Sequence, residues 1–333
     1  MTTRIFSGIK PTGHLTLGNY LGAVRQWVAA DQEPDEALFC VVDLHALTIE
    51  HDPARVRRLS RQAATLLLAA GLTPQKCTLF VQSHVDEHTR LAYLLECTAT
   101  DGELRRMIQY KEKAAQAAAS GAGVRLSLLT YPVLMAADIL AYRTDEVPVG
   151  EDQRQHVELA RDLAVRFNQR YGPTFTVPEA TLPVVAARVM DLQDPTSKMG
   201  KSGGAGPGVV FLLDEPEAIR KKVMRAVTDS GDGGVVYDRA ARPGVANLLD
   251  VLAACTGADP AVLAEGYGGY GALKRDVADA VMELLRPVQE RHAELAADPA
   301  GVEKVLREGA ERARALARPV VDRAYEAIGL LAP

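Results

Sequence analysis

Two short segments of this chain carry residue types that hold polyphosphates in proteins. The first follows an apolar run near the N-terminus and ends in Thr16-Leu17-Gly18-Asn19. A glycine at the start of a helix lets a phosphate approach the backbone, and the helix N-terminus supplies free N–H groups and a positive dipole. It matches neither of the two common glycine-rich phosphate loops. A plain strand–turn–helix, in which Thr16 only caps the helix, is the alternative.

The second segment is KMGKS, residues 198–202, in a stretch rich in glycine and serine. From a loop, Lys198 and Lys201 can reach a polyphosphate and neutralise the charge that develops as pyrophosphate leaves. Taken alone, this string is more typical of a solvated basic loop.

A third group of residues follows helical spacing. Tyr131, Met135 and Asp138 stand at i, i+4 and i+7, so they share one helical face that is otherwise apolar. A carboxylate on such a face needs a hydrogen-bond donor, because burying it without one is costly. An internal arginine is one candidate for that donor.

The elements that position these residues follow an alternating pattern. Short apolar runs are separated by amphipathic helical stretches, which is typical of strands buried on both faces of a parallel sheet. The pattern predicts a doubly wound, Rossmann-like α/β sheet. The expected strands are Thr3–Ser7, Ala37–Asp43, Thr78–Gln82, Glu146–Val149 and Val184–Met190, and the expected helices between them are Tyr20–Ala30, Pro53–Ala70 and Gln153–Tyr171.

Composition shifts predict the domain organisation. A mostly helical insertion spans about residues 86–142 and holds an Ala/Gly-rich stretch, Ala114–Gly123, expected as a mobile loop or frayed helix. We expect a catalytic domain over 1–192, the lysine loop and a flexible linker over 193–208, and a smaller all-helical domain over 209–300. Residues 301–333 are expected to form a final helix that packs back on the catalytic domain.

Overall composition limits the class of protein. The chain has 333 residues, 47% of them hydrophobic, and a net charge of −5. This supports a sizeable core and excludes wholesale disorder. The sequence shows neither a spanning apolar run nor a leader pattern, which favours the cytoplasm. The negative total argues against a surface that binds nucleic acid everywhere.

Metal chemistry is not expected from the sequence. Cys40, Cys77, Cys97 and Cys255 form no CxxC pair, no cysteine–histidine cluster has zinc spacing, and no HExxH is present. We expect buried free thiols and no metal site made by protein ligands.

The two lysine- and glycine-containing segments together resemble the signatures of class I aminoacyl-tRNA synthetases. TLGN resembles the HIGH signature with Thr and Asn in place of both histidines, and KMGKS resembles KMSKS with one change. His14 lies two residues too early to be the first histidine and is expected in a loop. Further segments resemble bacterial-type tryptophanyl-tRNA synthetases over nearly the whole chain: SGIKPTGHLTLGNY, VVDLHALT, GELRRMIQYKEK, LLTYPVLMAADIL, VPVGEDQRQHVELARDLAVRFN, KMGKS and AVTDS.

That resemblance implies activation of L-tryptophan with ATP and Mg²⁺, followed by transfer to tRNA(Trp), in a homodimer that uses the insertion as its interface. It implies that Asp138 accepts the indole N–H, the group that distinguishes tryptophan from phenylalanine. Implied catalytic residues are Thr16, Asn19, Lys113, Lys198 and Lys201. Implied ATP-binding residues are Lys10, Gly18, Asn19, Gly150, Asp152, Lys198, Met199, Lys201 and Ser202. Implied tryptophan-binding residues are Phe6, Gly8, His45, Tyr131, Met135, Asp138 and Gln153.

Two residues depart from the family pattern. Gly200 replaces the central serine of KMSKS, which removes a hydroxyl and loosens the loop. Lys10 stands where bacterial relatives commonly carry glutamine. Slower activation, and a specialised second copy tolerant of a tryptophan-mimicking antibiotic, are the hypotheses these changes raise.

Three rival functions stay open on sequence alone. They are a tyrosyl-tRNA synthetase, a small-molecule nucleotidylyltransferase and a catalytically weak RNA-binding paralogue. Cations cluster at Ile219–Arg225 and along the last helical stretch, at Arg307, Arg312, Arg314 and Arg318. These are candidates for tRNA contact, and solvated helix faces are the alternative.

Overall fold

A five-stranded parallel sheet forms the centre of the computed structural model, which describes residues 3–29, 36–119, 123–150, 153–181, 189–200, 206–229 and 234–331. The strand order is β3-β2-β1-β4-β5, and every pairing is parallel. The predicted doubly wound sheet is therefore confirmed. The strands are β1 (Ile5–Ile9), β2 (Ala37–Val41), β3 (Thr78–Val81), β4 (Glu146–Pro148) and β5 (Glu179–Thr181).

The strand order reverses beside β1, and this reversal is the topological switch point of the sheet. This strand pairs with β2 on one side and with β4 on the other, at Ile5–Ala37 and Ile5–Glu146. In such sheets ligands bind outside the carboxyl ends of the strands where the order reverses. The carboxyl ends of β1 and β4, at Ile9 and Pro148, therefore mark the expected crevice.

The central strands are apolar throughout because both of their faces are covered. Phe39 and Val41 point into one core and Leu38 and Cys40 into the other. Helix α3 (Pro53–Ala69) contributes to the first core, and α4 (Glu87–Glu96), α7 (Leu126–Leu140) and α8 (Arg154–Tyr171) contribute to the second. The alternation along β2 explains why its run reads as continuously hydrophobic.

One strand of the described sheet is not predicted from the sequence: β5, Glu179–Thr181. Of the predicted strand Val184–Met190, residues 184–188 lie outside the described part, and Met190 forms only an isolated bridge with Lys198. β5 is a short edge strand that is not fully buried and has no apolar run, so it has no strong sequence signal.

The helix predicted over Tyr20–Ala30 begins earlier and is irregular. Its parts are α1 (Leu17–Asn19), a π-helical stretch η1 (Tyr20–Val24) and α2 (Arg25–Ala29). The helical insertion contains α4, α5 (Asp101–Arg106), α6 (Ile108–Ala119) and α7. The Ala-rich stretch predicted as a loop or frayed helix is helical up to Ala119, because it continues α6.

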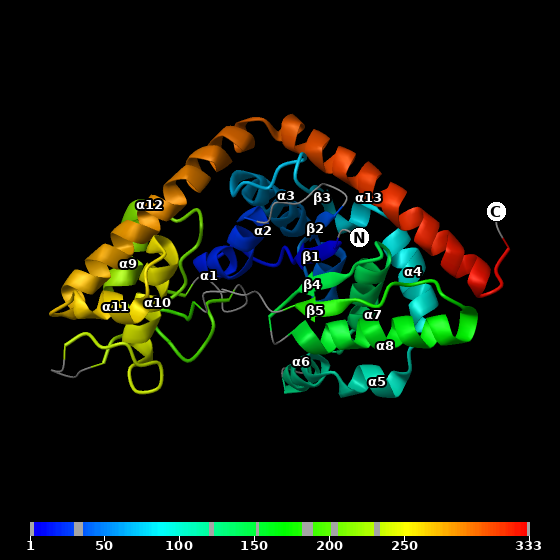
Figure 1. Cartoon of the computed structure of the whole chain (residues 1–333), viewed down its shortest axis with the longest axis horizontal. Coiled ribbons are helices and arrows are strands. Elements are labelled where there is room, and N and C mark those ends of the chain that lie inside the picture. Colours follow the sequence, from blue (N-terminus) through cyan, green and yellow to red (C-terminus); the bar gives the residue numbers. More distant parts are fainter. Residues whose placement is uncertain are drawn as a thin grey trace.

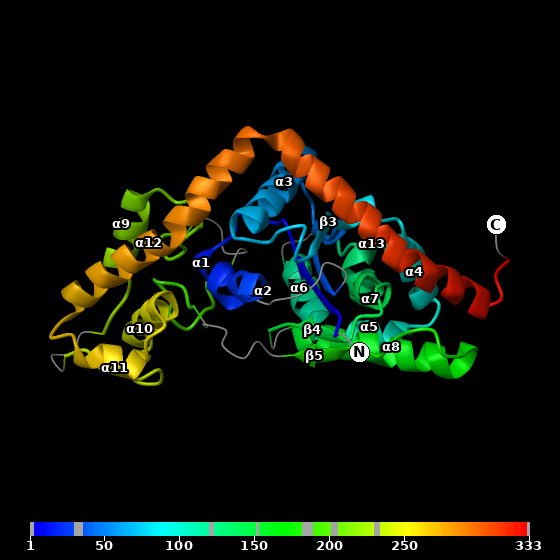
Figure 2. The same cartoon turned by 45° about the horizontal axis from the view of Figure 1, so that its top comes forward.

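The C-terminal third is helical and shaped like two arms (Figures 1 and 2). Its elements are α9 (Pro216–Met224), α10 (Pro243–Thr256), α11 (Pro260–Glu265), α12 (Tyr270–Ala297) and α13 (Pro299–Ala327). The arm α12 packs on α9, α10 and α3, whereas α13 runs back along β3 and α4. A Cβ on Gly309 would lie 1.9 Å from the Leu79 carbonyl oxygen, so only glycine allows this close approach.

Among the described helices, none has the length and apolar character needed to cross a membrane.

Candidate active site

The TLGN segment touches the lysine loop directly. Thr16 caps α1, with its Oγ1 accepting from the Asn19 N–H and its own N–H donating to Asn19 Oδ1. The Thr16 hydroxyl also lies 3.3 Å from the Met199 carbonyl oxygen. A Cβ on Gly18 would lie 2.8 Å from that same oxygen. The segment that caps α1 is therefore also the segment that contacts the lysine loop. Only a glycine at position 18 leaves room for this contact.

The backbone anchors the lysine loop on both sides. The Leu17 N–H donates to the Val210 carbonyl and the Leu212 N–H donates to Leu15, so residues flanking the loop pair with the first motif. The Met199 N–H donates to the Val189 carbonyl, and its side chain is buried in the core. Lys198 is exposed beside it. Lys201 and Ser202 lie outside the described residues.

Two lysines from distant segments meet near this crevice. Lys10 follows β1, and its Nζ donates to Thr48 Oγ1 at 3.2 Å. Burial and the nearby charge of Lys113 lower the pKa of Lys10 to about 8. Burial also lowers the pKa of Lys113, whose Nζ lies 5.6 Å from the centre of the Tyr131 ring. Two half-buried cations near each other favour an anion between them.

The Lys10 pKa leads to a pH prediction. The free protein loses the Lys10 charge as the pH rises through about 8. If Lys10 contacts a phosphate, kcat/KM for ATP falls over the same range, because this parameter reports ionisations of the free enzyme. The measurement is ATP–pyrophosphate exchange as a function of pH. The variant Lys10→Gln should lack this fall, and a wild-type fall that persists in the variant would assign it to another group.

Asp138 has three internal donors, all histidine or glutamine. His88 Nδ1 lies 2.5 Å from Oδ1 and His45 Nε2 lies 2.9 Å from Oδ2. Gln82 Nε2 lies 2.7 and 2.8 Å from the two oxygens. Burial alone would raise the pKa of Asp138, but the two histidines outweigh it and lower the pKa to about 2. The arginine considered as a partner from the sequence is not among these donors.

Two of the partners of Asp138 lie just after the carboxyl ends of neighbouring strands. His45 lies in η2 (Leu44–Thr48), just after β2, and Gln82 begins η3 (Gln82–His84), just after β3. The sequence prediction included His45 but missed Gln82, His88 and Tyr142. The position of Gln82, directly after a buried strand, is the signal that could have identified it.

The other residues predicted for tryptophan lie around the same helix. On α7, Tyr131 and Met135 are partly buried, and the Tyr131 hydroxyl lies 2.8 Å from His156 Nε2 and 3.1 Å from Gln109 Oε1. Burial raises the pKa of Tyr131, so the hydroxyl keeps its proton.

The strand and turn residues flank this helix. Phe6 is buried, with its ring stacked on Tyr142 at 5.6 Å, and Gly8 is exposed on β1. The Gln153 N–H donates to the Gly150 carbonyl just before α8. Asp152 lies outside the described residues.

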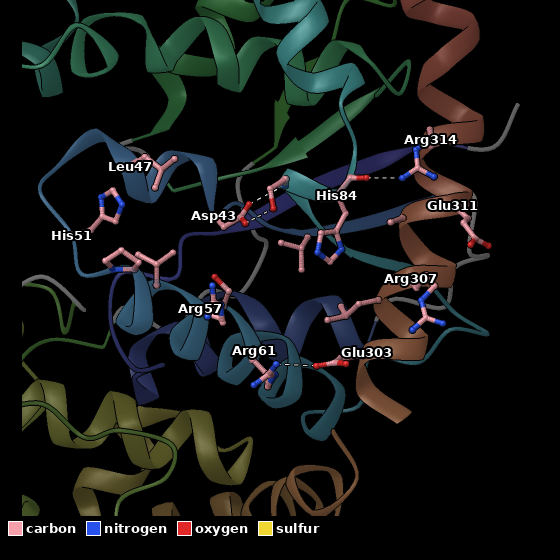
Figure 3. Close-up of a pocket in the computed structure, with 17 residues that line it drawn as sticks. Asp43, Leu47, His51, Arg57, Arg61, His84, Glu303, Arg307, Glu311 and Arg314 are labelled. Atoms are coloured by element: carbon pink, nitrogen blue, oxygen red, sulfur yellow. Dashed lines mark hydrogen bonds and ion pairs between the residues drawn. The ribbon is translucent and has the colours of Figure 1, made fainter. Parts of the chain in front are cut away.

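A groove of about 920 Å³ lies beside this site and not within it (Figure 3). It runs between α3 and α13 and touches the exits of β2 and β3. None of the residues predicted for ATP or tryptophan lines it. Arg61 pairs with Glu303 across it at 2.9 Å, and Arg314 donates to the His84 carbonyl at 2.7 Å (Figure 3).

The candidate cations for tRNA contact are partly used inside the protein. Arg314 and Arg312 bond to carbonyl oxygens of His84 and Pro74, so they attach α13 to the sheet. On α9, Arg220 pairs with Asp279 and Lys222 with Asp214. These four therefore have a structural role that the sequence did not indicate.

In the described part of the chain, no three His, Cys, Asp or Glu side chains gather in a way that could hold a metal ion.

Comparisons with known proteins agree with this architecture. The family model described as tRNA synthetases class I (W and Y) matches residues 1–286. The curated tryptophan–tRNA ligase 1 of Streptomyces coelicolor is 75% identical over 331 residues, covering 99% of this chain and 98% of the relative.

Two solved structures are similar over almost the full length. The tryptophanyl-tRNA synthetase of Mycoplasma pneumoniae has a TM-score of 0.90 and 34% identity, covering 99% of both chains. The enzyme of Campylobacter jejuni, complexed with ADP and tryptophan, has a TM-score of 0.83 and 32% identity, covering 98% of this chain and 100% of that one. The chain therefore belongs to the class I tRNA synthetases of the tryptophan and tyrosine (W and Y) family.

Proposed function

We propose that this protein is a tryptophan–tRNA ligase. It activates L-tryptophan with ATP to tryptophanyl-adenylate and pyrophosphate, and then transfers tryptophan to tRNA(Trp). The observation that carries the choice of amino acid is the buried Asp138 carboxylate on the α7 face shared with Tyr131 and Met135. The 75% identity to a tryptophan–tRNA ligase over 99% of the chain supports the same choice.

The first step needs no nucleophile from the protein. The tryptophan carboxylate attacks the α-phosphorus of ATP in line, a carboxylate–phosphorus bond forms, and the bond from the α-phosphorus to the bridging oxygen breaks. Pyrophosphate leaves with the electron pair. The protein orients the reactants and stabilises charge on the departing phosphates, for which Lys10, Lys113, Lys198 and Lys201 are our candidates.

Two polar segments hold the rest of the nucleotide and the amino acid. We assign the turn at Thr16, Gly18 and Asn19 to the phosphates, and Gly150 with Asp152 to the ribose. Gln153 is assigned to the amino acid's ammonium group. Mg²⁺ would enter with the ATP phosphates, beside the lysines that we assign to them, and would neutralise phosphate charge there.

Asp138 favours tryptophan over phenylalanine because an ionised carboxylate only accepts hydrogen bonds. The indole N–H is a donor that the carboxylate can satisfy, and phenylalanine lacks it. Tyrosine also carries a donor, so the choice of tryptophan over tyrosine is supported by the 75% identity to a tryptophan–tRNA ligase. A site built around a substrate's polar group rejects analogues without it by about 10⁴–10⁵.

The deciding experiment is ATP–pyrophosphate exchange with each of the twenty amino acids, followed by charging of tRNA(Trp). We expect exchange with tryptophan alone and charging of that tRNA. Exchange with tyrosine would favour the tyrosyl enzyme. Exchange with no amino acid would favour an RNA-binding paralogue.

We further propose a cytoplasmic homodimer whose interface is formed by the helical insertion. Large apolar side chains are exposed on three of its helices: Tyr93 on α4, Ile108 on α6 and Leu126 on α7. Exposed apolar residues of this size often mark contact surfaces.

Tyr93→Asp tests this interface. We expect the dimer dissociation constant to rise about 30-fold or more, because loss of an aromatic anchor costs at least about 2 kcal/mol. Light scattering during size-exclusion chromatography over a dilution series measures it. The matched control is Val262→Asp, on the exposed face of α11, which should leave the mass unchanged. A wild-type protein that is monomeric at all concentrations would rule out the dimer.

A further inference from the structure

Behind Asp138 lies a chain of buried side chains that the proposed reaction does not use. The Tyr142 hydroxyl lies 2.7 Å from His88 Nε2, and His88 Nδ1 lies 2.5 Å from Asp138 Oδ1. Tyr142 and His88 are fully buried, and Asp138 is 1% exposed. Such a network is fully partnered at each step, so the position of every proton in it matters.

The hydrogen bonds assign the protons. Asp138 is ionised and only accepts, so His88 Nδ1 carries the proton that it donates. Burial raises the pKa of Tyr142 well above its usual value, so the Tyr142 hydroxyl keeps its proton, and it lies in hydrogen-bonding contact with Nε2. Both ring nitrogens of His88 are therefore partnered, Nδ1 by Asp138 and Nε2 by Tyr142, and these two contacts fix the orientation of the ring.

Gln82 completes the inner shell of the carboxylate. Its Oε1 accepts from the Leu44 N–H at 3.1 Å, which fixes the amide so that Nε2 points at Asp138. Oδ1 thus has two donors from the protein interior, His88 and Gln82. Oδ2 is shared between Gln82 and His45, and His45 is the only one of the three donors that is not completely buried, at 7% exposed. The substrate side of the carboxylate is therefore Oδ2.

We propose that Tyr142 and His88 are positioning residues for tryptophan selectivity. They hold Asp138 as an acceptor-only carboxylate with Oδ2 available to a ligand N–H, where that N–H takes the place of His45. This inference rests on the proposed tryptophan-activating function and assigns the selectivity of that site to two residues that do not touch the substrate.

Loss of the Tyr142 hydroxyl has a defined consequence. His88 Nε2 then loses the partner that it has in the wild type, so the ring keeps only one of the two contacts that orient it. A ring that turns weakens the bond from Nδ1 to Asp138 Oδ1, and the carboxylate is no longer held with Oδ2 toward the ligand.

The first test is Tyr142→Phe, which removes one hydroxyl and keeps the ring stacked on Phe6. In ATP–pyrophosphate exchange we expect KM for tryptophan to rise about tenfold, with KM for ATP unchanged. The control is Tyr237→Phe, which removes a hydroxyl that donates to Asp250 at 2.8 Å on the distant helix α10. The control should leave both KM values unchanged.

The second test separates positioning from simple packing. His88→Asn places an amide donor where Nδ1 stands, whereas His88→Leu offers none. We expect His88→Asn to keep KM for tryptophan within about threefold of wild type and His88→Leu to raise it about 30-fold. The same variants should lose discrimination between tryptophan and 1-methyltryptophan, which has no indole N–H.

Two outcomes would overturn the inference. One is a wild-type KM for tryptophan in Tyr142→Phe, and the other is equal damage from His88→Asn and His88→Leu in folded protein. Absence of tryptophan-dependent exchange in the wild type is a different result, which removes the proposed function itself.

Discussion

Asp138→Asn is expected to lower kcat/KM for tryptophan by about 10⁴ in ATP–pyrophosphate exchange. The substitution keeps the shape of the side chain but replaces one acceptor oxygen with an NH₂ group. That group would face donors from His45, His88 and Gln82, which are now within 2.9 Å of the carboxylate. The buried donors that face the new NH₂ group would lose their hydrogen bonds to residue 138, and the indole N–H of the substrate would lose its acceptor.

The design must separate lost recognition from lost folding. KM for ATP and the midpoint of thermal unfolding are measured on the same samples, because removing a buried, paired charge also destabilises the protein. Asp250→Asn is the matched control, since Asp250 accepts from Tyr237 and Arg239 far from the sheet. It is expected to lower stability without changing KM for tryptophan. A folded Asp138→Asn protein with near-normal tryptophan kinetics would remove Asp138 from the site.

How much of this arrangement can be predicted from the sequence depends on how far apart in the chain the interacting residues lie. The apolar runs at Ala37–Val41 and Thr78–Val81 are local signals, so the parallel sheet is predictable from them. β5 is only three residues long and two of them are polar, and its strand character comes from its pairing with β4. No local pattern carries that information.

The same reasoning applies to the site. The helical spacing of Tyr131, Met135 and Asp138 predicts a shared face on α7. The donors to Asp138 come from residues 50 to 93 positions away, because the exits of β2 and β3 and the start of α4 converge on α7. The burial of Lys10 and its approach to Lys113 are likewise products of the fold, and together they lower the pKa of Lys10.

Gly18→Ala is expected to lower the rate of ATP–pyrophosphate exchange about 100-fold, the scale of loss that follows a misplacement of about 1 Å in a reacting geometry. The added Cβ would lie 2.8 Å from the Met199 carbonyl oxygen and 3.3 Å from its Cβ. Met199 cannot retreat freely, because its N–H bonds to Val189 and its side chain is buried. Either α1 or the lysine loop must move, and both carry groups that we assign to the phosphates.

Gly200→Ser is the matched variant for this contact. Among the described residues, its Cβ would meet only the Lys198 carbonyl oxygen, at an ordinary 3.6 Å, and the serine adds a hydroxyl that can reach phosphate. Exchange should therefore match or exceed the wild-type rate. If Gly18→Ala kept full activity, the contact between the two motifs would be unnecessary for activation. If Gly200→Ser lost as much activity as Gly18→Ala, the loop would be intolerant of any added side chain. The short distance at Gly18 would then not account for the loss in Gly18→Ala. We expect the two glycines to differ because the backbone at Gly18 packs directly against the lysine loop and leaves no room for a Cβ.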